Sequence, residues 1–295
     1  LLIPSLMNAK ILKAYNIRGI YGTDFDEHDA YAIGRATVDF LGCQRLAVGR
    51  DARASSPVLF ESFTRGAMEA GADILDLGVI TTPMVYFAAG RLDIDAAVSI
   101  TASHNPPEYN GMKICLRGAL PVGETSGLSA IRDIVLKGEF KTSEKTGSLI
   151  PEDIKPAYYG FFASFAELDD HRFSLVIDTA NAMGVLELPI YGQLSENLAV
   201  THLYDDLAHP FSAHEANPLK TETLDELRAR VLTKKADLGI AYDGDADRIG
   251  FVDETGQIIP MDLITALLAK EVLKKKPGST ILYDLRSSRS VKEFI

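Results

Sequence analysis

Three aspartates alternate with small residues in the segment Asp243-Gly244-Asp245-Ala246-Asp247, and Arg248 follows directly. The flanking stretches ADLGIAY and IGFVD are apolar and predict strands, so the acidic segment is expected to form a tight loop. Carboxylate oxygens that converge on such a loop favour Mg²⁺, Ca²⁺ or Mn²⁺ over Zn²⁺. The segment therefore predicts a divalent-metal site, with Arg248 placed to bind a phosphate beside the ion.

Two other interpretations of this segment are a solvated acidic turn and the calcium-binding loop of an EF-hand. Three aspartates at alternate positions repel one another without a counter-ion, which disfavours the solvated turn. Counted from Asp243, positions 1, 3, 5 and 12 are acidic as in an EF-hand, but position 6 is Arg248 where that loop requires glycine. Because the flanks also predict strands rather than helices, the EF-hand is rejected.

A second candidate segment, Thr101-Ala102-Ser103-His104-Asn105-Pro106-Pro107, follows the apolar stretch AAVSI. Proline cannot continue a strand ladder, so the chain should turn out at the carboxyl end of the strand, where α/β proteins place ligands. A Ser-His-Asn-Pro turn is by itself most often a side-chain-capped turn. The functional interpretation is an exposed Ser103 that carries phosphate, with His104 and Lys113 as candidate proton-transfer partners.

Basic residues beside glycines and turns are the candidates for binding phosphate. Asn110-Gly111 predicts a turn that returns Lys113 toward Ser103. A lysine near a dianion normally stays charged, and it would need a lowered pKa to act as a base. Arg18 stands next to Gly19 and could approach a phosphate closely, although a surface arginine is the default. Further candidates are Arg50, Arg53 and Arg248.

The amino-acid composition limits the classes of partner that this chain can bind. The formal net charge of −11 argues against a nucleic-acid surface, which needs clustered lysine and arginine. No apolar run approaches the ~20 residues needed to span a bilayer. Both cysteines, Cys43 and Cys115, lie in apolar contexts, which suits a reducing cytoplasm. The negative charge does not exclude a phosphorylated substrate, but an acidic protein that binds phosphate must gather its cations in one cleft.

Short apolar runs alternate with helical patterns through the chain, which indicates α/β architecture: repeated three-layer α/β domains with mixed, largely parallel sheets. Pro83 is expected to open one helix. The other expected helices cover 28–42, 56–70, 125–137, 154–168, 184–195 and 221–234. The expected strands cover 45–49, 73–78, 96–101, 112–116, 173–178 and 198–204, together with the two that flank the acidic segment.

The polar run 141–151 is expected to be a linker. It divides an N-terminal α/β domain with the serine segment, 1–150, from a second α/β domain with the acidic segment, 151–256. Asp51, Asp178 and Asp284 each close an expected strand before a polar turn, which indicates a repeated unit. Residues 257–295 would begin a third unit but fall short of the ~50 residues of the smallest domains, so the chain is expected to be truncated.

In this order, the segments AYNIRG, VGRDARASSP, TASHNPPEYNGMKI and DGDADR resemble the α-D-phosphohexomutases, and most of all the bacterial phosphomannomutase/phosphoglucomutase branch. The resemblance runs from about residue 10 to the end. It implies that Ser103 is a phosphoserine and that one Mg²⁺ is bound by Ser103 and the aspartates. Arg18 and Arg248 would contact the phosphate, and His104 and Lys113 would assist proton transfer. The implied metal ligands are Ser103, Asp243, Asp245 and Asp247.

The resemblance also implies a two-step reaction. The phosphoserine phosphorylates the free hydroxyl of a mannose or glucose phosphate, the hexose 1,6-bisphosphate turns over, and its other phosphate returns to Ser103. The family's sugar-recognition loop and terminal phosphate-binding loop are missing, so this chain is expected to be inactive or impaired, and the preferred hexose cannot be read. Asn16 stands where the family usually has aspartate, and Ala182 where glycine is common.

Three alternatives remain open at this point. The chain could be a non-catalytic metal- or phosphate-binding fragment, or a phosphatase if water reaches phosphorylated Ser103. A phosphoglucosamine mutase is less favoured, because Thr-Ala-Ser-His looks more like the mannose/glucose branch. The oligomeric state cannot be read from the sequence. Every interpretation of catalysis requires that Ser103 of the first unit meets the aspartates of the second around one divalent ion.

Overall fold

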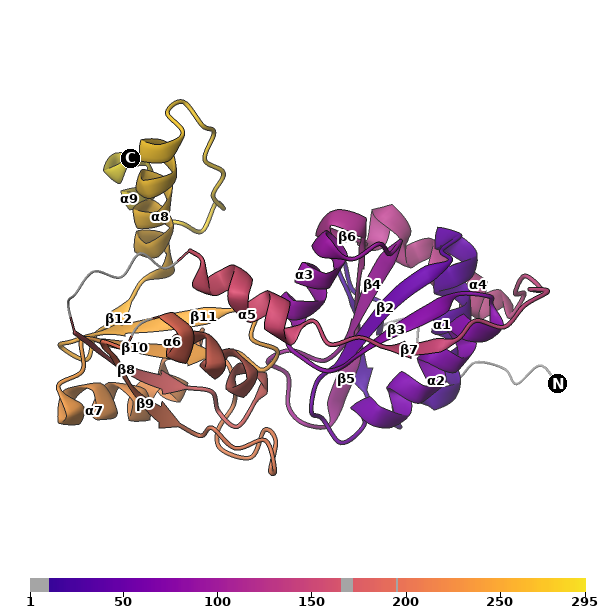
Figure 1. The fold of residues 1–295 in the computed structure, drawn as a ribbon, viewed down its shortest axis with the longest axis horizontal. Helices are drawn as coiled ribbons and strands as arrows, with labels where there is room; N and C mark the ends of the chain where they lie inside the picture. The colour runs from indigo at the N-terminus through magenta and orange to yellow at the C-terminus, as the bar shows by residue number, and fades with distance from the viewer. Residues whose placement is uncertain (1–10, 166–171, 195) are drawn as a thin grey trace.

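The computed structural model describes residues 11–165, 172–194 and 196–295. Two mixed β-sheets lie side by side, each with helices packed on it (Figure 1). We call the seven-stranded sheet with its helices the first unit, and the five-stranded sheet with its helices the second unit. A helical segment that follows them, 261–294, stands off the second unit.

The first sheet has parallel strands in its middle and at one edge, and antiparallel strands at the other edge. Its order is β1 (Ile17–Ile20), β5 (Tyr109–Leu116), β4 (Ala96–Ile100), β2 (Arg45–Arg50), β3 (Asp73–Val79) and β7 (Leu149–Pro151), and β6 (Leu120–Pro121) pairs with β5. β4, β2, β3 and β7 are parallel. β5 runs antiparallel to β1 and β4.

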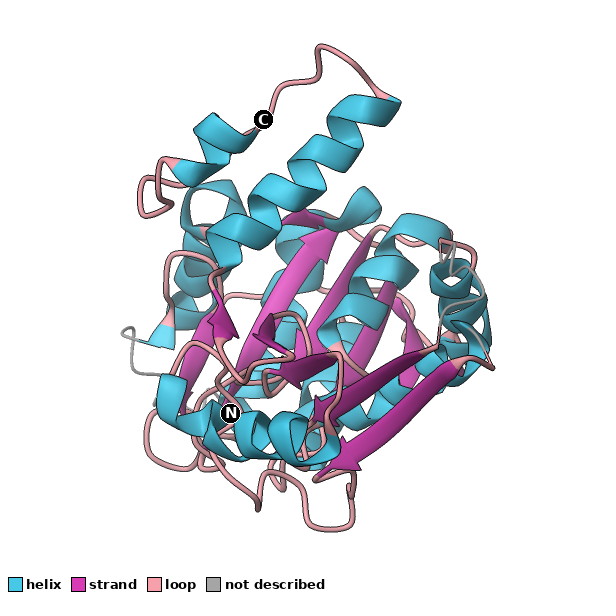
Figure 2. Cartoon of the chain, turned by 90° about the vertical axis from the view of Figure 1, so that its left-hand side faces the viewer, coloured by secondary structure: helices cyan, strands magenta, loops and turns pink. Residues whose placement is uncertain are grey.

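Helices cover both faces of this sheet because its strand residues alternate between two cores (Figure 2). Leu46 and Val48 belong to one core, with α1 (Glu27–Leu41), α2 (Ser56–Glu69) and α4 (Ser129–Lys137). Ala47 belongs to the other, with α3 (Thr82–Arg91) and α5 (Lys155–Ala163). A single π-turn, η3 (Glu124–Leu128), precedes α4, and a short 3₁₀ segment, η2 (Arg117–Ala119), follows β5.

The second sheet has the same three-layer plan. Its order is β12 (Ile258–Ile259), β11 (Ile249–Asp253), β10 (Leu238–Tyr242), β8 (Phe173–Asp178) and β9 (Leu198–Leu203), with β10, β8 and β9 parallel. Val176 packs with α7 (Asp225–Lys234), and Ile177 packs with α6 (Leu188–Leu194) on the other face. The 3₁₀ turns η4 (Met183–Glu187) and η5 (Thr221–Leu224) lead into these two helices.

The predicted fold class is confirmed, and most predicted elements form within a few residues of their expected bounds. The predicted helix 154–168 ends earlier, with α5 at Ala163, and its last residues lie outside the described ranges. The same holds for residue 195 at the end of the predicted helix 184–195. The run 141–151 is more than a linker, since β7 adds an edge strand to the first sheet. The domain boundaries at 150 and 256 stay predictions.

One predicted strand is wrong. Residues 280–284, which were expected to form a strand that closes on Asp284 as the third copy of the repeat, are irregular and follow α8 (Met261–Lys275). A strand needs neighbouring strands to satisfy its backbone groups, and the described part of this segment offers only α8 and α9 (Ser290–Phe294). The local turn does repeat, because Oδ1 of Asp51, of Asp178 and of Asp284 accepts the N–H two residues further on.

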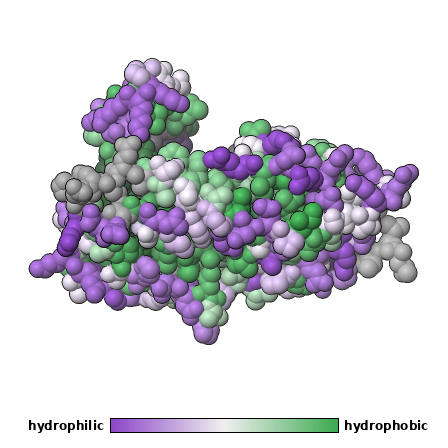
Figure 3. Space-filling model, viewed as in Figure 1, coloured by the Kyte–Doolittle hydropathy of each residue, from purple (hydrophilic) through white to green (hydrophobic). Residues whose placement is uncertain are grey.

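The helix α8 exposes apolar side chains on the segment that stands off the second unit (Figure 3). Among its exposed large residues are Leu263, Leu267, Leu268 and Val272. None of the helices in the described ranges is long and apolar enough to cross a membrane. Both cysteines are buried and free.

Candidate active site

The serine loop, residues 101–109, leaves β4 at its carboxyl end. Ser103 has a φ of 53°, a left-handed conformation that is uncommon for a residue with a side chain. Its N–H donates to Oγ1 of Thr101 over 2.9 Å. The prediction that Ser103 is exposed is wrong, because its surface is 0% accessible. The second unit covers it.

Arg53 supports the serine loop by hydrogen bonds to its backbone. All five of its side-chain N–H donors have partners: Nε donates to Asp51, and the two terminal nitrogens donate to backbone carbonyls of the loop. The carbonyls belong to Ser103, Asn105, Pro106 and Tyr109, at 2.6 to 3.1 Å. The guanidinium is buried, and the ring of Phe211 from the second unit lies 4.4 Å from it. Arg53 is therefore committed to shaping the loop.

The acidic loop, residues 243–248, connects β10 to β11, and Arg248 closes it. The N–H of Arg248 donates to Oδ1 of Asp243 over 2.9 Å, and its Nε donates to Oδ2 over 3.0 Å. The N–H of Asp243 in turn donates to the carbonyl of Arg248. Ala246 takes the left-handed conformation, with a φ of 62°. This tight closure turns the side chains of the alternate aspartates toward one region.

The serine loop and the acidic loop touch. Oγ of Ser103 donates to Oδ2 of Asp243 over 2.7 Å, and a terminal nitrogen of Arg248 lies 2.7 Å from the same Oγ. A Cβ on Gly244 would lie 2.1 Å from the carbonyl oxygen of Ser103, so only glycine allows this approach. The structure thus brings together the serine of the first unit and the aspartates of the second.

Two residues of the first unit hold the remaining aspartates. Nζ of Lys113, on β5, lies 2.5 Å from Oδ2 of Asp245 and 2.5 Å from Oδ2 of Asp247. Thr82, at the start of α3, donates its hydroxyl to Oδ2 of Asp245 over 2.6 Å. Its N–H donates to the backbone carbonyl of the same aspartate over 3.1 Å.

The three aspartates suit a hard divalent cation. One carboxylate oxygen from each lies within 4.8 Å of the other two. Oδ1 of Asp245 is buried and has no hydrogen-bond partner, which is the state of an oxygen kept for a ligand. These three side chains would hold one divalent ion through carboxylate oxygens, the donor type that Mg²⁺ prefers. An oxygen-only ligand set does not favour Zn²⁺.

Burial and charge shift the pKa values of the groups at this site. Burial, reinforced by Asp245 and Asp247, raises the pKa of Asp243. Burial also favours the neutral form of Asp245, but Lys113 outweighs it and lowers the pKa of that carboxyl. Burial lowers the pKa of Lys113 as well, yet the two aspartates beside it raise that pKa above its usual range. Lys113 therefore carries its charge.

His104 lies beside the serine. Its Nδ1 is 3.4 Å from Oγ of Ser103 and also contacts the guanidinium of Arg248. Burial, followed by the nearby Arg248 and Arg18, lowers the pKa of His104 to about 4. Since a neutral imidazole keeps one free lone pair, the ring is an acceptor at neutral pH.

Arg18 lies at the margin of this group. It projects from β1, and a terminal nitrogen donates to Oδ1 of Asn105 in the serine loop over 3.1 Å. Its Nε is buried and has no hydrogen-bond partner. The structure therefore places Arg18 against the serine loop rather than against Ser103 itself.

Two of the sequence-based expectations need correction. Asn110 and Gly111 form no turn but lie within β5. Glycine is needed at 111 because β1 passes close by, and a Cβ there would lie 2.0 Å from the carbonyl oxygen of Ile17. Lys113 reaches the site along this strand. Arg50 and Arg53 are not free to bind phosphate, since Arg50 pairs with Asp76 and Arg53 is used by the serine loop.

The two departures from the family pattern are easily accommodated. Ala182 has a φ of −112°, which any residue adopts, so the structure does not require glycine there. The carbonyl of Asn16 accepts the N–H of Lys13 in the turn before β1. Sequence reasoning missed Thr82 and the structural role of Arg53. The Thr81-Thr82-Pro83 run does signal a helix start, but nothing in it signals a contact with a distant aspartate.

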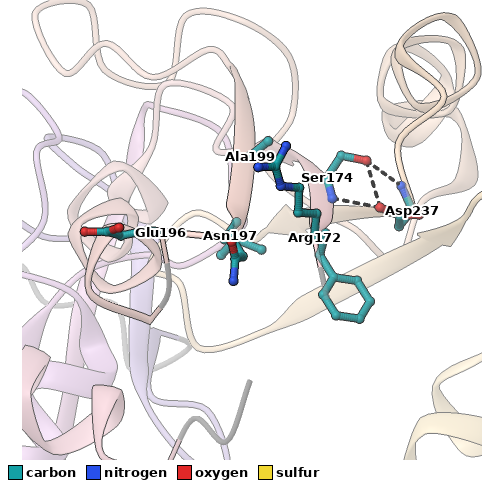
Figure 4. A pocket seen from close by; sticks show the side chains of 8 residues that line it. Arg172, Ser174, Glu196, Asn197, Ala199 and Asp237 are labelled. Atoms are coloured by element: carbon teal, nitrogen blue, oxygen red, sulfur yellow. Dashed lines mark hydrogen bonds between the residues drawn. The ribbon is translucent and has the colours of Figure 1, made fainter. Parts of the chain in front are cut away.

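A separate hollow of about 480 Å³ lies at the amino ends of β8, β9 and β10, opposite the acidic loop (Figure 4). Ser174 donates both its N–H and its hydroxyl to Asp237 there, at 2.7 and 2.8 Å. These bonds tie the starts of two parallel strands together. None of the residues of the serine or acidic loops lines this hollow.

The fold and the site define a class: an α/β protein of repeated three-layer units in which a buried serine faces an aspartate loop. Two family profiles match this chain. The profile "Phosphoglucomutase/phosphomannomutase, alpha/beta/alpha domain I" matches residues 9–142, and that of domain II matches residues 156–256. The chain belongs to the phosphoglucomutase/phosphomannomutase family, which confirms the resemblance read from the sequence.

Individual relatives agree with this assignment. A phosphoglucomutase of Neisseria gonorrhoeae is 38% identical over 97% of this chain and 62% of its own length. A phosphomannomutase of Methanocaldococcus jannaschii is 38% identical over 97% of this chain and 63% of its own. A solved phosphoglucomutase/phosphomannomutase family protein of Burkholderia thailandensis superposes with a TM-score of 0.88 at 33% identity, over 98% of this chain and 65% of that one. The chain thus spans about three fifths of the length of the curated relatives it matches.

Proposed function

We propose that this chain carries the phosphoryl-transfer site of a phosphohexomutase, which interconverts hexose 1-phosphate and hexose 6-phosphate of mannose, glucose or both. The observation that supports this most is the contact of Ser103 with Asp243 and Arg248 across the two units. A hydroxyl held between an acidic loop and an arginine is suited to carrying phosphate, because arginine binds phosphate oxygens with charge-assisted hydrogen bonds. Names of relatives that include both sugars support the substrate class.

In the proposed reaction, Ser103 starts as a phosphoserine. The bond between its Oγ and phosphorus breaks, and a bond forms between phosphorus and the free hydroxyl oxygen of the hexose phosphate. The hydroxyl proton leaves to a base, and the serine oxygen gains a proton. The resulting 1,6-bisphosphate then returns its other phosphate to Ser103 by the reverse chemistry. His104, 3.4 Å from Oγ, is the candidate to exchange a proton with the serine.

Asp243, Asp245 and Asp247 would hold one Mg²⁺, together with an oxygen at Ser103. A bound Mg²⁺ supplies neutralisation of the charge on the transferring phosphoryl oxygens. Arg248 would bind the same phosphoryl group, and Arg18, on β1, would support the serine loop through Asn105. Lys113 places Asp245 and Asp247 and contributes positive charge.

Intact-protein mass spectrometry tests the central assignment. The chain is incubated with Mg²⁺ and glucose 1,6-bisphosphate, and one phosphate increment is expected on Ser103. Ser103→Ala should gain none, because no acceptor oxygen is left at the acidic loop. Ser126→Ala, which removes an exposed hydroxyl elsewhere, should be phosphorylated as the unaltered chain is. An increment that persists in Ser103→Ala would contradict the proposal.

The same experiment separates the alternatives. Because Ser103 is buried, water should reach its phosphate slowly, and the increment should persist. Loss of the increment within seconds would indicate a phosphatase. If the increment transfers to added mannose 1-phosphate or glucose 1-phosphate as a bisphosphate, the mutase is supported. No increment under any condition would indicate a non-catalytic binding protein.

A further inference from the structure

Asp245 has two carboxylate oxygens in very different surroundings. Oδ2 accepts hydrogen bonds from Lys113 and from Thr82. Oδ1 is buried and has no hydrogen-bond partner, and it is the only carboxylate oxygen of which this holds among the residues that the structure describes. Since an unpaired buried oxygen is costly, this one is kept for a ligand. Whatever fixes Oδ2 therefore decides where Oδ1 points.

Thr82 fixes Asp245 at two points. Its N–H donates to the carbonyl of Asp245 over 3.1 Å, and its hydroxyl donates to Oδ2 over 2.6 Å. The hydroxyl has a single proton, and an ionised carboxylate only accepts. The neighbouring Ser99 hydroxyl, 2.9 Å away, must therefore donate to Thr82. This chain of donors sets the direction of every hydrogen bond and leaves the threonine one orientation.

The start of α3 that carries Thr82 is itself tied to the second unit. Thr81 caps the helix by accepting the N–H of Met84. Its hydroxyl donates to Oε1 of the buried Glu187 over 2.7 Å. The two first residues of this end of α3 thus each donate to a carboxylate of the second unit. The positive end of the helix dipole adds to their attraction for carboxylates.

We propose that Thr82 is a positioning residue for divalent-metal binding: it holds Asp245 so that Oδ1 faces the ion. This inference rests on the proposed function, because it requires that the acidic loop binds the metal. Thr82 would act only through Asp245. Groups that orient metal ligands in this way typically change metal affinity by about 10–100-fold when they are removed.

The test is Mg²⁺ binding to the chain by calorimetry, with Mn²⁺ binding followed by electron paramagnetic resonance. Thr82→Val keeps the shape of the side chain and removes the hydroxyl. It should lower the affinity for both Mg²⁺ and Mn²⁺ about 10–100-fold. Thr82→Ala provides a second variant without added bulk. Thr82→Ser restores a hydroxyl on Cβ and should recover most of the lost affinity. Asp245→Asn, which alters the ligand itself, should weaken binding more than any variant of Thr82.

Thr37→Val is the matched control. Thr37 is a buried threonine on α1 whose hydroxyl bonds the carbonyl of Ile33 one turn earlier, far along the chain from the acidic loop. This variant removes a buried threonine hydroxyl away from the acidic loop and should bind Mg²⁺ unchanged, so a general effect of losing such a hydroxyl would be recognised.

The outcomes separate this inference from the proposed function. If the unaltered chain binds Mg²⁺ and Thr82→Val binds it equally well, the role of Thr82 is refuted while the metal site stands. If Thr82→Ser binds as weakly as Thr82→Val, the hydroxyl is not what positions Asp245, and the inference fails. If the unaltered chain binds neither ion, the metal site itself is refuted, and the proposed function loses its cation.

Discussion

The serine loop and the acidic loop meet at one site but are held in place by different parts of the chain. The serine loop is fixed from within its own unit, by the guanidinium of Arg53 on four of its carbonyls. The acidic loop closes on itself through Arg248, but the side chain of Asp245 is held from the other unit, by Thr82 and Lys113. The support of the serine loop thus lies within its own unit, whereas Asp245 of the acidic loop is held across the contact between the units.

The serine loop and the acidic loop therefore depend on different parts of the structure. The backbone that carries Ser103 is supported from within the first unit by Arg53. The orientation of the candidate metal ligands depends on how the two units pack. A change within the first unit should therefore act mainly on stability and on the serine, whereas a change at the contact between the units should act on the acidic loop.

The largest effect is expected for Arg53→Met. Removing the guanidinium leaves the buried Asp51 without its ion pair and takes one donor from each of four loop carbonyls. Breaking a buried pair on one side costs about 3–5 kcal/mol, so the free energy of unfolding measured with urea should fall by that amount. Arg117→Met, at an exposed pair with Asp93, should change it by less than about 1 kcal/mol. Equal effects of the two substitutions would show that Arg53 does not support the serine loop.

A smaller effect is expected from Glu187 at the contact between the units. Burial raises the pKa of this carboxyl to about 7, from an ordinary value of 4.5, although Thr81 and Tyr158 donate to it. Because the folded-state pKa is the higher one, the stability that Glu187 contributes is fully present below pH 4.5 and is lost as the pH rises through 7. The contribution of Glu187 to the free energy of unfolding should differ by about 3 kcal/mol between pH 4.5 and pH 7.

Glu187→Gln isolates this contribution. The unfolding free energy of the unaltered chain should fall between about pH 4.5 and 7 relative to that of the variant, and the difference should level off above pH 7. The tyrosines that face the carboxyl, Tyr158, Tyr159, Tyr191 and Tyr242, have raised pKa values through burial and stay neutral across this window. Parallel stability profiles for the two proteins would rule out a buried titrating Glu187.

The smallest of these effects is expected for Gly244→Ala, which acts on the meeting of the two loops. The added Cβ would meet the carbonyl oxygen of Ser103 at 2.1 Å, so the loops must move apart. Overpacking of this kind costs about 1–3 kcal/mol in the free energy of unfolding. Phosphorylation of Ser103 by glucose 1,6-bisphosphate should also slow. Gly192→Ala, on α6 with open space around it, is the control and should be neutral or stabilising. Unchanged phosphorylation in Gly244→Ala would show that the close approach is not needed.

Much of the fold was predictable because its signals are local. Apolar runs gave the strand from Phe173 to Asp178 at its observed bounds, and helical spacing gave α1 and α2 within one residue. The prediction failed at 280–284, where the described part of the chain offers an apolar run no neighbouring strand. It also failed at Asn110 and Gly111, where a turn-like pair lies inside β5 because another strand passes closely. In both cases the outcome depended on neighbours that are distant in the sequence.

The sequence by itself determined which chemical groups are present and which loops carry them: Ser103, the three aspartates and Arg248 stand on segments whose type and spacing mark them. Only the tertiary structure decided which acceptors the arginine and lysine side chains contact. Arg53 was indistinguishable from a phosphate ligand until its five donors were seen on Asp51 and the serine loop, and nothing in the sequence signalled the contact of Thr82 with Asp245. The physical reason is that a hydrogen-bond donor is satisfied by whatever acceptor folding brings within about 3 Å, and its separation along the chain carries no information about that partner.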